Sequence, residues 1–179
     1  MSNGSSTSSK TAIVTLWSTP LFQSDNCTKL LEILSIKGYP YVSFSTIKSA
    51  PDASDQIASR KQVVLTLYQW RQLLGKACGI DFFLTQLPAI NEVGLKVIKE
   101  EVLATAGSTQ KRVQVVALDG KVFVSIVEFF LAPDLKVFVP TKKSVFLTPI
   151  EFRILVQQSE NVEIFLKLGS FQATYNPGI

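Results

Sequence analysis

Residues 41–74 read YVSFSTIKSAPDASDQIASRKQVVLTLYQWRQLL, and residues 123–156 read FVSIVEFFLAPDLKVFVPTKKSVFLTPIEFRILV. The two stretches align without a gap at a shift of 82 positions and share 11 identical residues in 34; ordinary composition would give about two. Aromatic positions also match, since Tyr41 aligns with Phe123 and Trp70 with Phe152. The chain therefore uses one module twice, and such a repeat is expected to act through a symmetric surface rather than one catalytic pocket.

Each copy begins with a predicted β-hairpin. In the second copy, β-rich runs at Val113–Leu118 and Lys121–Phe130 flank Asp119-Gly120, a strong hairpin signal. In the first copy, Gly38 separates Leu30–Ile36 from Tyr39–Ile47.

Two shorter strands are expected to follow in each module. In the second copy, Ala132-Pro133-Asp134 predicts a turn, Lys136–Val139 a short strand, Pro140–Lys143 another turn and Ser144–Leu147 the fourth strand. In the first copy, Ala50-Pro51-Asp52 and Gln62–Leu65 take the corresponding roles.

A helix then closes each copy. Thr66-Leu67-Tyr68-Gln69 and Thr148-Pro149-Ile150-Glu151 are capping boxes, the second with proline at the first helical position. The apolar residues that follow recur at helical spacing, which predicts that Trp70 and Phe152 are core residues. The apolar runs 80–84 and 162–166 fit either an extension of these helices or short strands.

These patterns predict an α+β fold of two pseudo-symmetric antiparallel four-stranded sheets, each followed by a helix (ββββα twice). We expect one domain over residues 11–168 between a Ser-rich disordered tail at 1–10 and a tail at 169–179. Within the domain, the first repeat covers about 11–86, a linker about 87–110 and the second repeat about 111–168. Glu92–Ala104, inside the linker, is compatible with either helix or strand.

Composition excludes several classes of function. The chain has no histidine and only two cysteines, Cys27 and Cys78, outside any CxxC motif, so we expect no metal site, no cofactor and no enzyme activity. Both cysteines are interpreted as buried free thiols, and no secretory signal or membrane-spanning run is seen, which predicts an intracellular protein. Charged residues make up only 18% and the net charge is +4, which fits an oligomer interface and permits a polyanionic partner.

The second copy resembles the DNA-binding module of the eukaryotic coactivator called positive cofactor four. The resemblance rests on Asp119-Gly120, Glu128-Phe129-Phe130, Lys142-Lys143 and Thr148–Phe152 in this order. It implies a module that binds single-stranded DNA as a dimer. Asp119 and Val127 stand where that family has basic residues.

The chain over about residues 11–168 looks still more like the Whirly proteins of plants, which carry this unit twice. Here the resemblance rests on Ser59–Val63, Asp81-Phe82-Phe83 and Thr148–Phe152, while the family's Lys-Gly-Lys-Ala-Ala-Leu motif is absent. It implies a homo-oligomer, dimer or tetramer, that holds single-stranded nucleic acid on its sheets. The related trypanosome mitochondrial proteins bind guide RNA. The nucleus is the expected compartment, with an organelle as the alternative.

Binding single strands needs cations for the phosphates and flat side chains for the bases. Lys29, Arg60 and Lys61 of the first copy align with Lys111, Lys142 and Lys143 of the second, and the repeated basic pairs before the fourth strand are the main signal. Singly, turn lysines are commonly just solvated, and Phe130 also fits a core position. The predicted nucleic-acid-binding residues are Lys29, Lys37, Tyr39, Lys48, Arg60, Lys61, Lys111, Arg112, Lys121, Phe130, Lys142 and Lys143.

The first hypothesis is therefore a single-stranded nucleic-acid-binding protein of low sequence specificity, acting in transcription, replication or genome maintenance. The alternatives are an RNA-binding or annealing factor, and a non-catalytic structural or interaction module that kept the fold without the ligand. The low charge fraction, Asp119 and Val127 favour the last of these.

Overall fold

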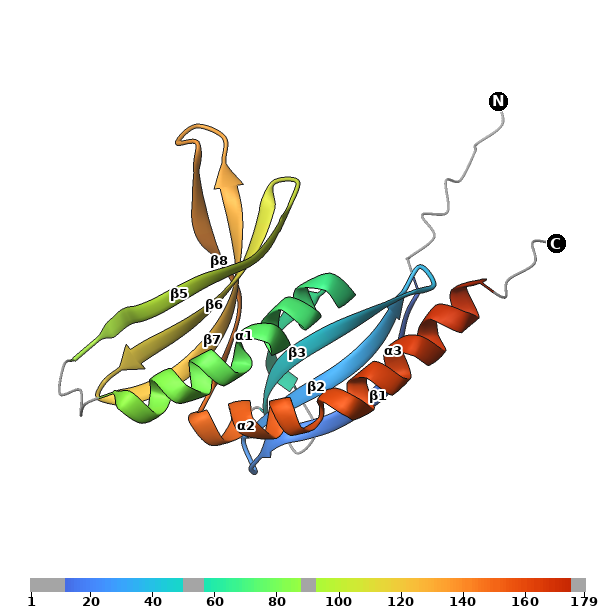
Figure 1. Ribbon diagram of the computed structural model, residues 1–179, viewed down its shortest axis with the longest axis horizontal. Helices are drawn as coiled ribbons and strands as arrows, with labels where there is room; N and C mark the ends of the chain where they lie inside the picture. Colours follow the sequence, from blue (N-terminus) through green and yellow to red (C-terminus); the bar gives the residue numbers. More distant parts are fainter. Residues whose placement is uncertain (1–11, 50–56, 88–92, 175–179) are drawn as a thin grey trace.

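A computed structural model describes residues 12–49, 57–87 and 93–174 (Figure 1). Eight strands and three helices follow one another as four strands, one helix, four strands and two helices. Their bounds are β1 Ile13–Gln23, β2 Cys27–Ile36, β3 Tyr39–Ser49, β4 Ile57–Leu65, α1 Leu67–Gln86, β5 Leu95–Ala106, β6 Thr109–Leu118, β7 Lys121–Ala132, β8 Val137–Leu147, α2 Pro149–Gln157 and α3 Ser159–Thr174.

The strands form two antiparallel meanders, β1-β2-β3-β4 and β5-β6-β7-β8. This confirms the predicted α+β class with two four-stranded sheets. The hairpin turns are confirmed as well: Lys37-Gly38 has φ values of 54° and 81°, and Asp119-Gly120 has 49° and 77°. Positive φ at both central residues is what a two-residue turn needs to match the twist of its strands.

The strands at the end of each sheet differ from the prediction. Residues 137–139 of the predicted short strand and Ser144–Leu147 belong to one strand, β8, whereas Lys136 lies in the turn before it. The turn expected at Pro140–Lys143 is wrong because Pro140 pairs with Phe129 inside the sheet. The register slips between Val127 and Phe129, so a bulge accommodates the turn-like residues. The turn predicted at 50–52 lies outside the described residues.

The first strand of each sheet was not predicted. The segment 87–110, expected to be a linker, contains β5, so the second sheet already begins at Leu95. β1 and β5 each pair with the following strand through two register irregularities. Such bulges break the alternation of side chains that sequence reading depends on, which explains why both segments were ambiguous.

Both capping boxes are confirmed. Thr66 accepts a hydrogen bond from the backbone N–H of Gln69, and Thr148 accepts one from that of Glu151, with the return bonds also present. The runs 80–84 and 162–166 are helical, in α1 and α3. Because α3 extends to Thr174, the tail predicted to start at 169 is wrong up to that residue.

The helices of the two repeats tie the sheets together. α1 contacts β3 and β4 of its own sheet and also β5 and β6 of the other, whereas α3 packs on β1, β2 and β3 (Figure 1). Trp17 of β1 stacks on Phe165 of α3 with ring centroids 5.5 Å apart. A helix of the second repeat therefore covers the sheet of the first.

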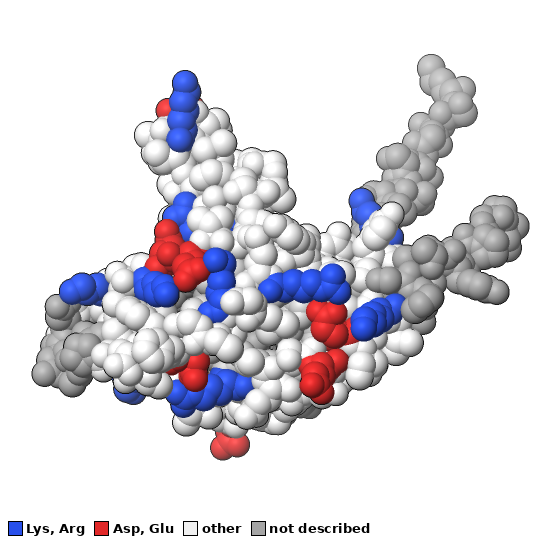
Figure 2. Space-filling view, viewed as in Figure 1, with Lys and Arg blue, Asp and Glu red and all other residues white. Residues whose placement is uncertain are grey.

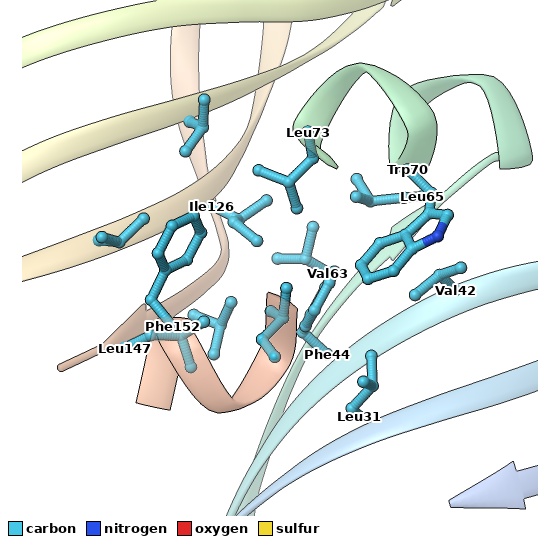
Figure 3. Packing of buried hydrophobic residues seen from close by; sticks show 14 of the residues in the cluster. Leu31, Val42, Phe44, Val63, Leu65, Trp70, Leu73, Ile126, Leu147 and Phe152 are labelled. Carbon is cyan, nitrogen blue, oxygen red and sulfur yellow. The ribbon is translucent and has the colours of Figure 1, made fainter. Parts of the chain in front are cut away.

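Because the helices of each repeat pack on both sheets, the buried residues form one contiguous core. Trp70 and Phe152, which are equivalent at the shift of 82, are both completely buried, as predicted (Figure 3). Around them lie Phe44 and Val63 from the first sheet and Ile126 from the second (Figure 3). The two copies are thus halves of one core rather than independent units.

Candidate nucleic-acid interface

Three of the predicted lysines meet at the end of the first sheet. Lys29 on β2 pairs with Thr46 on β3, which pairs with Lys61 on β4. Partners in register point to the same face of a sheet, and Lys61 lies two residues before the core residue Val63. We call Lys29, Thr46 and Lys61 the first row; it continues the helix-covered face beyond the end of the core.

A pocket of about 250 Å³ opens over this row. Lys48 adds a third ammonium group from the next row of the same face, where it pairs with Cys27 and Ser59. Phe146 and Ser144 of β8 form the opposite wall. The basic pocket, as we name it, is lined by Cys27, Lys29, Thr46, Lys48, Ser59, Lys61, Ser144 and Phe146.

The three lysines of the basic pocket are not equivalent. The Lys29 ammonium donates to Glu151 at 2.6 Å, its side chain is only 15% exposed, and it also lies 5.7 Å from the ring centroid of Phe22. Lys48 and Lys61 are exposed and form no ion pair with another residue in the ranges described. Lys29 is therefore held in place, while Lys48 and Lys61 are available to an anion.

The second sheet has an equivalent row with a different centre. At the shift of 82, Lys29, Thr46 and Lys61 become Lys111, Glu128 and Lys143. We call these three residues the second row. The Glu128 carboxylate accepts a hydrogen bond from the ammonium group of Lys111 and forms an ion pair with that of Lys143 at 3.0 Å. The second row is therefore already occupied by a negative charge of the protein itself.

Electrostatics supports this description of the second row. Burial by itself raises the pKa of Glu128, but the hydrogen bonds and charges of Lys111 and Lys143 outweigh it and hold that pKa below its ordinary value. The side chains of Lys111 and Glu128 are 9% and 12% exposed, whereas that of Lys143 is 64% exposed. Lys111 is thus a buried partner of Glu128 rather than a surface cation.

The two residues of each predicted basic pair have different surroundings. Arg60 and Lys61 are neighbours on a strand and point to opposite faces. On the outer face Arg60 donates to Glu32 at 2.8 Å and to Ser45 at 3.0 Å. Lys142 and Lys143 lie in the bulge of β8, where Lys143 is drawn to Glu128.

Arg112 likewise has partners within the outer face of the second sheet. It donates to Glu100 at 2.7 Å, and its guanidinium lies 4.0 Å from the ring centroid of Phe129. Five predicted cations, namely Lys29, Arg60, Lys111, Arg112 and Lys143, therefore form ion pairs.

The other predicted residues are exposed but outside the basic pocket. Lys37, Tyr39 and Lys121 lie at the two hairpin turns. Phe130 is 41% exposed and pairs with Thr109, so it is neither fully core nor part of the pocket. Lys142 is exposed on β8. Figure 2 shows this dispersion, since cations on the viewed face alternate with anions instead of forming one basic field.

Sequence reading missed the polar and aromatic lining of the basic pocket. Thr46, Ser59 and Cys27 could have been found by continuing the strand alternation outward from the core. Phe146 and Ser144 could not, because their place opposite the first sheet depends on how β4 and β8 approach each other.

A second hollow adjoins the basic pocket on the outer face of the second sheet. Its volume is about 400 Å³, and it shares Ser144 and Phe146 with the basic pocket. Phe129 and Val127 are among the apolar residues that line it. The rings of Phe123 and Phe146 pack edge to face with their centroids 6.3 Å apart. This contact fixes the orientation of the Phe146 ring between the two hollows.

Within the described ranges, no group of three or more Cys, Asp or Glu residues is placed to hold a metal ion. None of the described helices has both the length and the apolar character needed to cross a membrane.

Three comparisons with known proteins were made. No protein-family model matches this chain, and no curated protein matches its sequence. Among solved structures it is similar to the crystal structure of WHY1 from Arabidopsis thaliana, with a TM-score of 0.37 and 11% sequence identity over 94% of this chain and 96% of that chain.

Proposed function

We propose that this chain is a non-catalytic protein that binds single-stranded nucleic acid with low sequence specificity. The observation that supports it is the convergence of Lys29, Lys48 and Lys61 on one pocket whose far wall is the phenyl ring of Phe146. Ammonium groups beside a flat aromatic ring are the two elements that single strands require.

The chemistry of this pocket accounts for the expected low specificity. Lysine ammonium groups contact phosphates, which are the same for every nucleotide, and a phenyl ring can stack on any base. The apolar hollow beyond Phe146 offers room for a base that leaves the strand. Nothing in this arrangement requires one base rather than another.

Fluorescence anisotropy with labelled single-stranded DNA, matched RNA and duplex DNA tests the proposal. We expect saturable binding of a single strand, with log affinity falling against log salt at a slope of about −2 for three phosphate contacts. The duplex is expected to bind more weakly. The comparison of DNA with RNA decides between the two kinds of strand, both of which the pocket can accept.

A pair of double variants shows whether the basic pocket is responsible. Lys48→Glu with Lys61→Glu is expected to lower affinity by at least about tenfold and to flatten the salt slope by about 1.4. Lys136→Glu with Lys167→Glu changes the net charge equally at exposed positions outside the pocket and is the matched control. Equal losses in both double variants would show that binding depends on overall charge alone.

A second candidate is a protein-interaction module of the same fold. Leu95 and Val97, at the rim of the outer hollow, are 60% and 47% exposed, which is unusual for apolar strand residues facing water. An assembly of several chains would cover them. Light scattering after size exclusion is expected to show a homo-oligomer; an assembly without any salt-sensitive nucleic-acid binding would favour this candidate over the first.

Participation in transcription, replication or genome maintenance, membership in the Whirly-like superfamily, and a nuclear or organellar site of action belong to the same proposal. They depend on strand binding being demonstrated first.

A further inference from the structure

We propose that the first row is a binding site for one phosphate group, and that Glu128 fills the equivalent site in the second repeat, so that only the first repeat is open to a nucleic-acid strand. This inference rests on the proposed function and deepens it, because it assigns the ligand group and the repeat that binds it.

The internal repeat provides the comparison. In the second row, two ammonium groups from neighbouring strands converge on a pair of carboxylate oxygens held between them. Lys29 and Lys61 lie in register on either side of Thr46, which carries a hydroxyl and no charge. They are equivalent to Lys111, which pairs with Glu128 in the same way, and to Lys143, which lies in the bulge beside Glu128. The second row therefore shows which group this pattern of strands holds: an anion with two or more oxygen acceptors.

The first row together with the neighbouring Lys48 offers such an anion two uncompensated ammonium groups, those of Lys48 and Lys61, because Lys29 is already paired with Glu151. Thr46 and Ser59 provide hydroxyl groups at the pocket wall, and Lys48 adds a cation where the second repeat has Phe130. A hydroxyl can donate to a phosphate oxygen, as an ammonium group can. Glu151 neutralises Lys29 alone. The charges of Lys48 and Lys61 are not compensated by any described residue.

The second row cannot offer the same. A strand phosphate would have to displace the Glu128 carboxylate from Lys111, whose side chain is 9% exposed. Breaking a buried charge pair is costly, and the incoming phosphate would also meet the repulsion of the displaced carboxylate. The central residue of the row, Thr46 in one half and Glu128 in the other, thus distinguishes the two halves of this pseudo-symmetric fold.

Transferring that residue tests the inference. Thr46→Glu places in the first row the carboxylate that the second row already contains, and we expect it to lower oligonucleotide affinity at least tenfold and to flatten the salt slope. Thr46→Gln has the same length without the charge, and Thr15→Glu adds the same charge at the other end of the sheet, where Thr15 pairs with Leu34. Both controls are expected to stay within about threefold of the unmodified protein. Unchanged affinity of Thr46→Glu would overturn the inference.

A second pair of variants covers the case in which Thr46→Glu does not fold. Lys61→Gln and Lys143→Gln are equivalent substitutions of exposed lysines in the two rows. We expect Lys61→Gln to weaken oligonucleotide binding about threefold to tenfold and Lys143→Gln to leave it unchanged. Equal effects in both would show that the second row is not closed.

Titration with inorganic phosphate separates this inference from the proposed function. Amide signals of Thr46 and Lys61 are expected to shift saturably in the unmodified protein and not in Thr46→Glu. If phosphate binds in this way but no oligonucleotide does, the row is a site for a free phosphate and the nucleic-acid function is wrong. If an oligonucleotide binds and Thr46→Glu has no effect on either ligand, the function stands and the assignment of this row is wrong.

Discussion

The first and second rows occupy equivalent positions on equivalent strands, and yet only the first is open to an external anion. In the first, two lysines flank Thr46 and line an open pocket; in the second, two lysines are bound to Glu128. The difference teaches that a duplicated fold preserves the positions of charges more strictly than their availability. A count of lysines in each copy would have rated the two rows alike.

The core shows the opposite behaviour, because its equivalent positions remain alike. Trp70 and Phe152 are both fully buried aromatic anchors at the start of a capped helix. Two surface ion pairs are also related by the repeat. Arg71 pairs with Glu163, and their equivalents at the shift of 82, Arg153 and Asp81, pair with each other. These two crossed pairs join α1 to the helices of the other repeat.

The largest effect is expected from the aromatic anchors. Trp70→Ala and Phe152→Ala should each lower the free energy of unfolding by about 3–5 kcal/mol, because each leaves a large cavity in one shared core. Trp70→Phe should cost much less, since the indole Nε1 has no hydrogen-bond partner among the described residues and the second repeat already uses phenylalanine there. Denaturant unfolding measures all three, and a cost confined to one of the two alanine variants would mean that the repeats fold separately.

The two rows should respond differently to loss of their central residue. Glu128→Gln leaves the buried Lys111 without a carboxylate and is expected to cost about 3 kcal/mol. Thr46→Val, at the equivalent position, should change stability by less than about 1 kcal/mol because no charge pair is broken. Chemical denaturation of both variants checks the contrast; similar costs would contradict the description of Thr46 as an open position.

The stability of the protein at acid pH should depend on Glu128. The pKa of Glu128 is lower in the folded chain than in the unfolded one, so its contribution to stability is complete above the unfolded pKa of about 4.3 and disappears as pH falls through the folded value. The unmodified protein is therefore expected to lose more stability than Glu128→Gln between pH 5 and pH 3, values taken as roughly spanning the carboxyl range. Thermal unfolding at several pH values measures this, and parallel pH profiles would argue against the shift.

The capping boxes should be nearly equivalent in the two repeats. Thr66→Ala and Thr148→Ala each remove an acceptor from the first turn of a helix and are expected to cost about 1 kcal/mol. The Thr148 variant should cost somewhat more, because Glu151 of that box also holds Lys29. Serine at either position, which retains the acceptor, is the control in urea unfolding.

The smallest effect is expected at the crossed surface pairs. A double-mutant cycle on Arg153 and Asp81, whose side chains are 48% and 42% exposed, should give a coupling of about 0.5 kcal/mol or less. A coupling well above 1 kcal/mol would show that these pairs fix the position of the helices. Raising the salt concentration should reduce it further.

Local sequence patterns predicted those features of the fold that depend on residues close together in the chain. The hairpin at Asp119-Gly120 and the box at Thr148–Glu151 depend on residues within a few positions of each other, and both were predicted. β1 and β5 were missed because their bulges interrupt the alternation. The split of β8 at Pro140 was wrong because proline at an edge strand can be tolerated at or near a bulge.

The candidate site divides in the same way. Lys29, Lys48 and Lys61 were among the predicted cations, and alternation along the strands could have added Thr46. That Lys111 and Lys143 are neutralised could not be read from the chain, because Glu128 meets them across strands and through a bulge.

By itself, the sequence determined that one ββββα module occurs twice, that each helix is capped, and which aromatic side chains enter the core, because these properties follow from residue spacing and composition. Only the tertiary structure decided that the helices cross between the sheets, that Phe146 faces the lysines of the first sheet, and that Glu128 rather than an external anion occupies the second row. Those outcomes depend on contacts between residues far apart in the chain, where burial and charge pairing outweigh local preference.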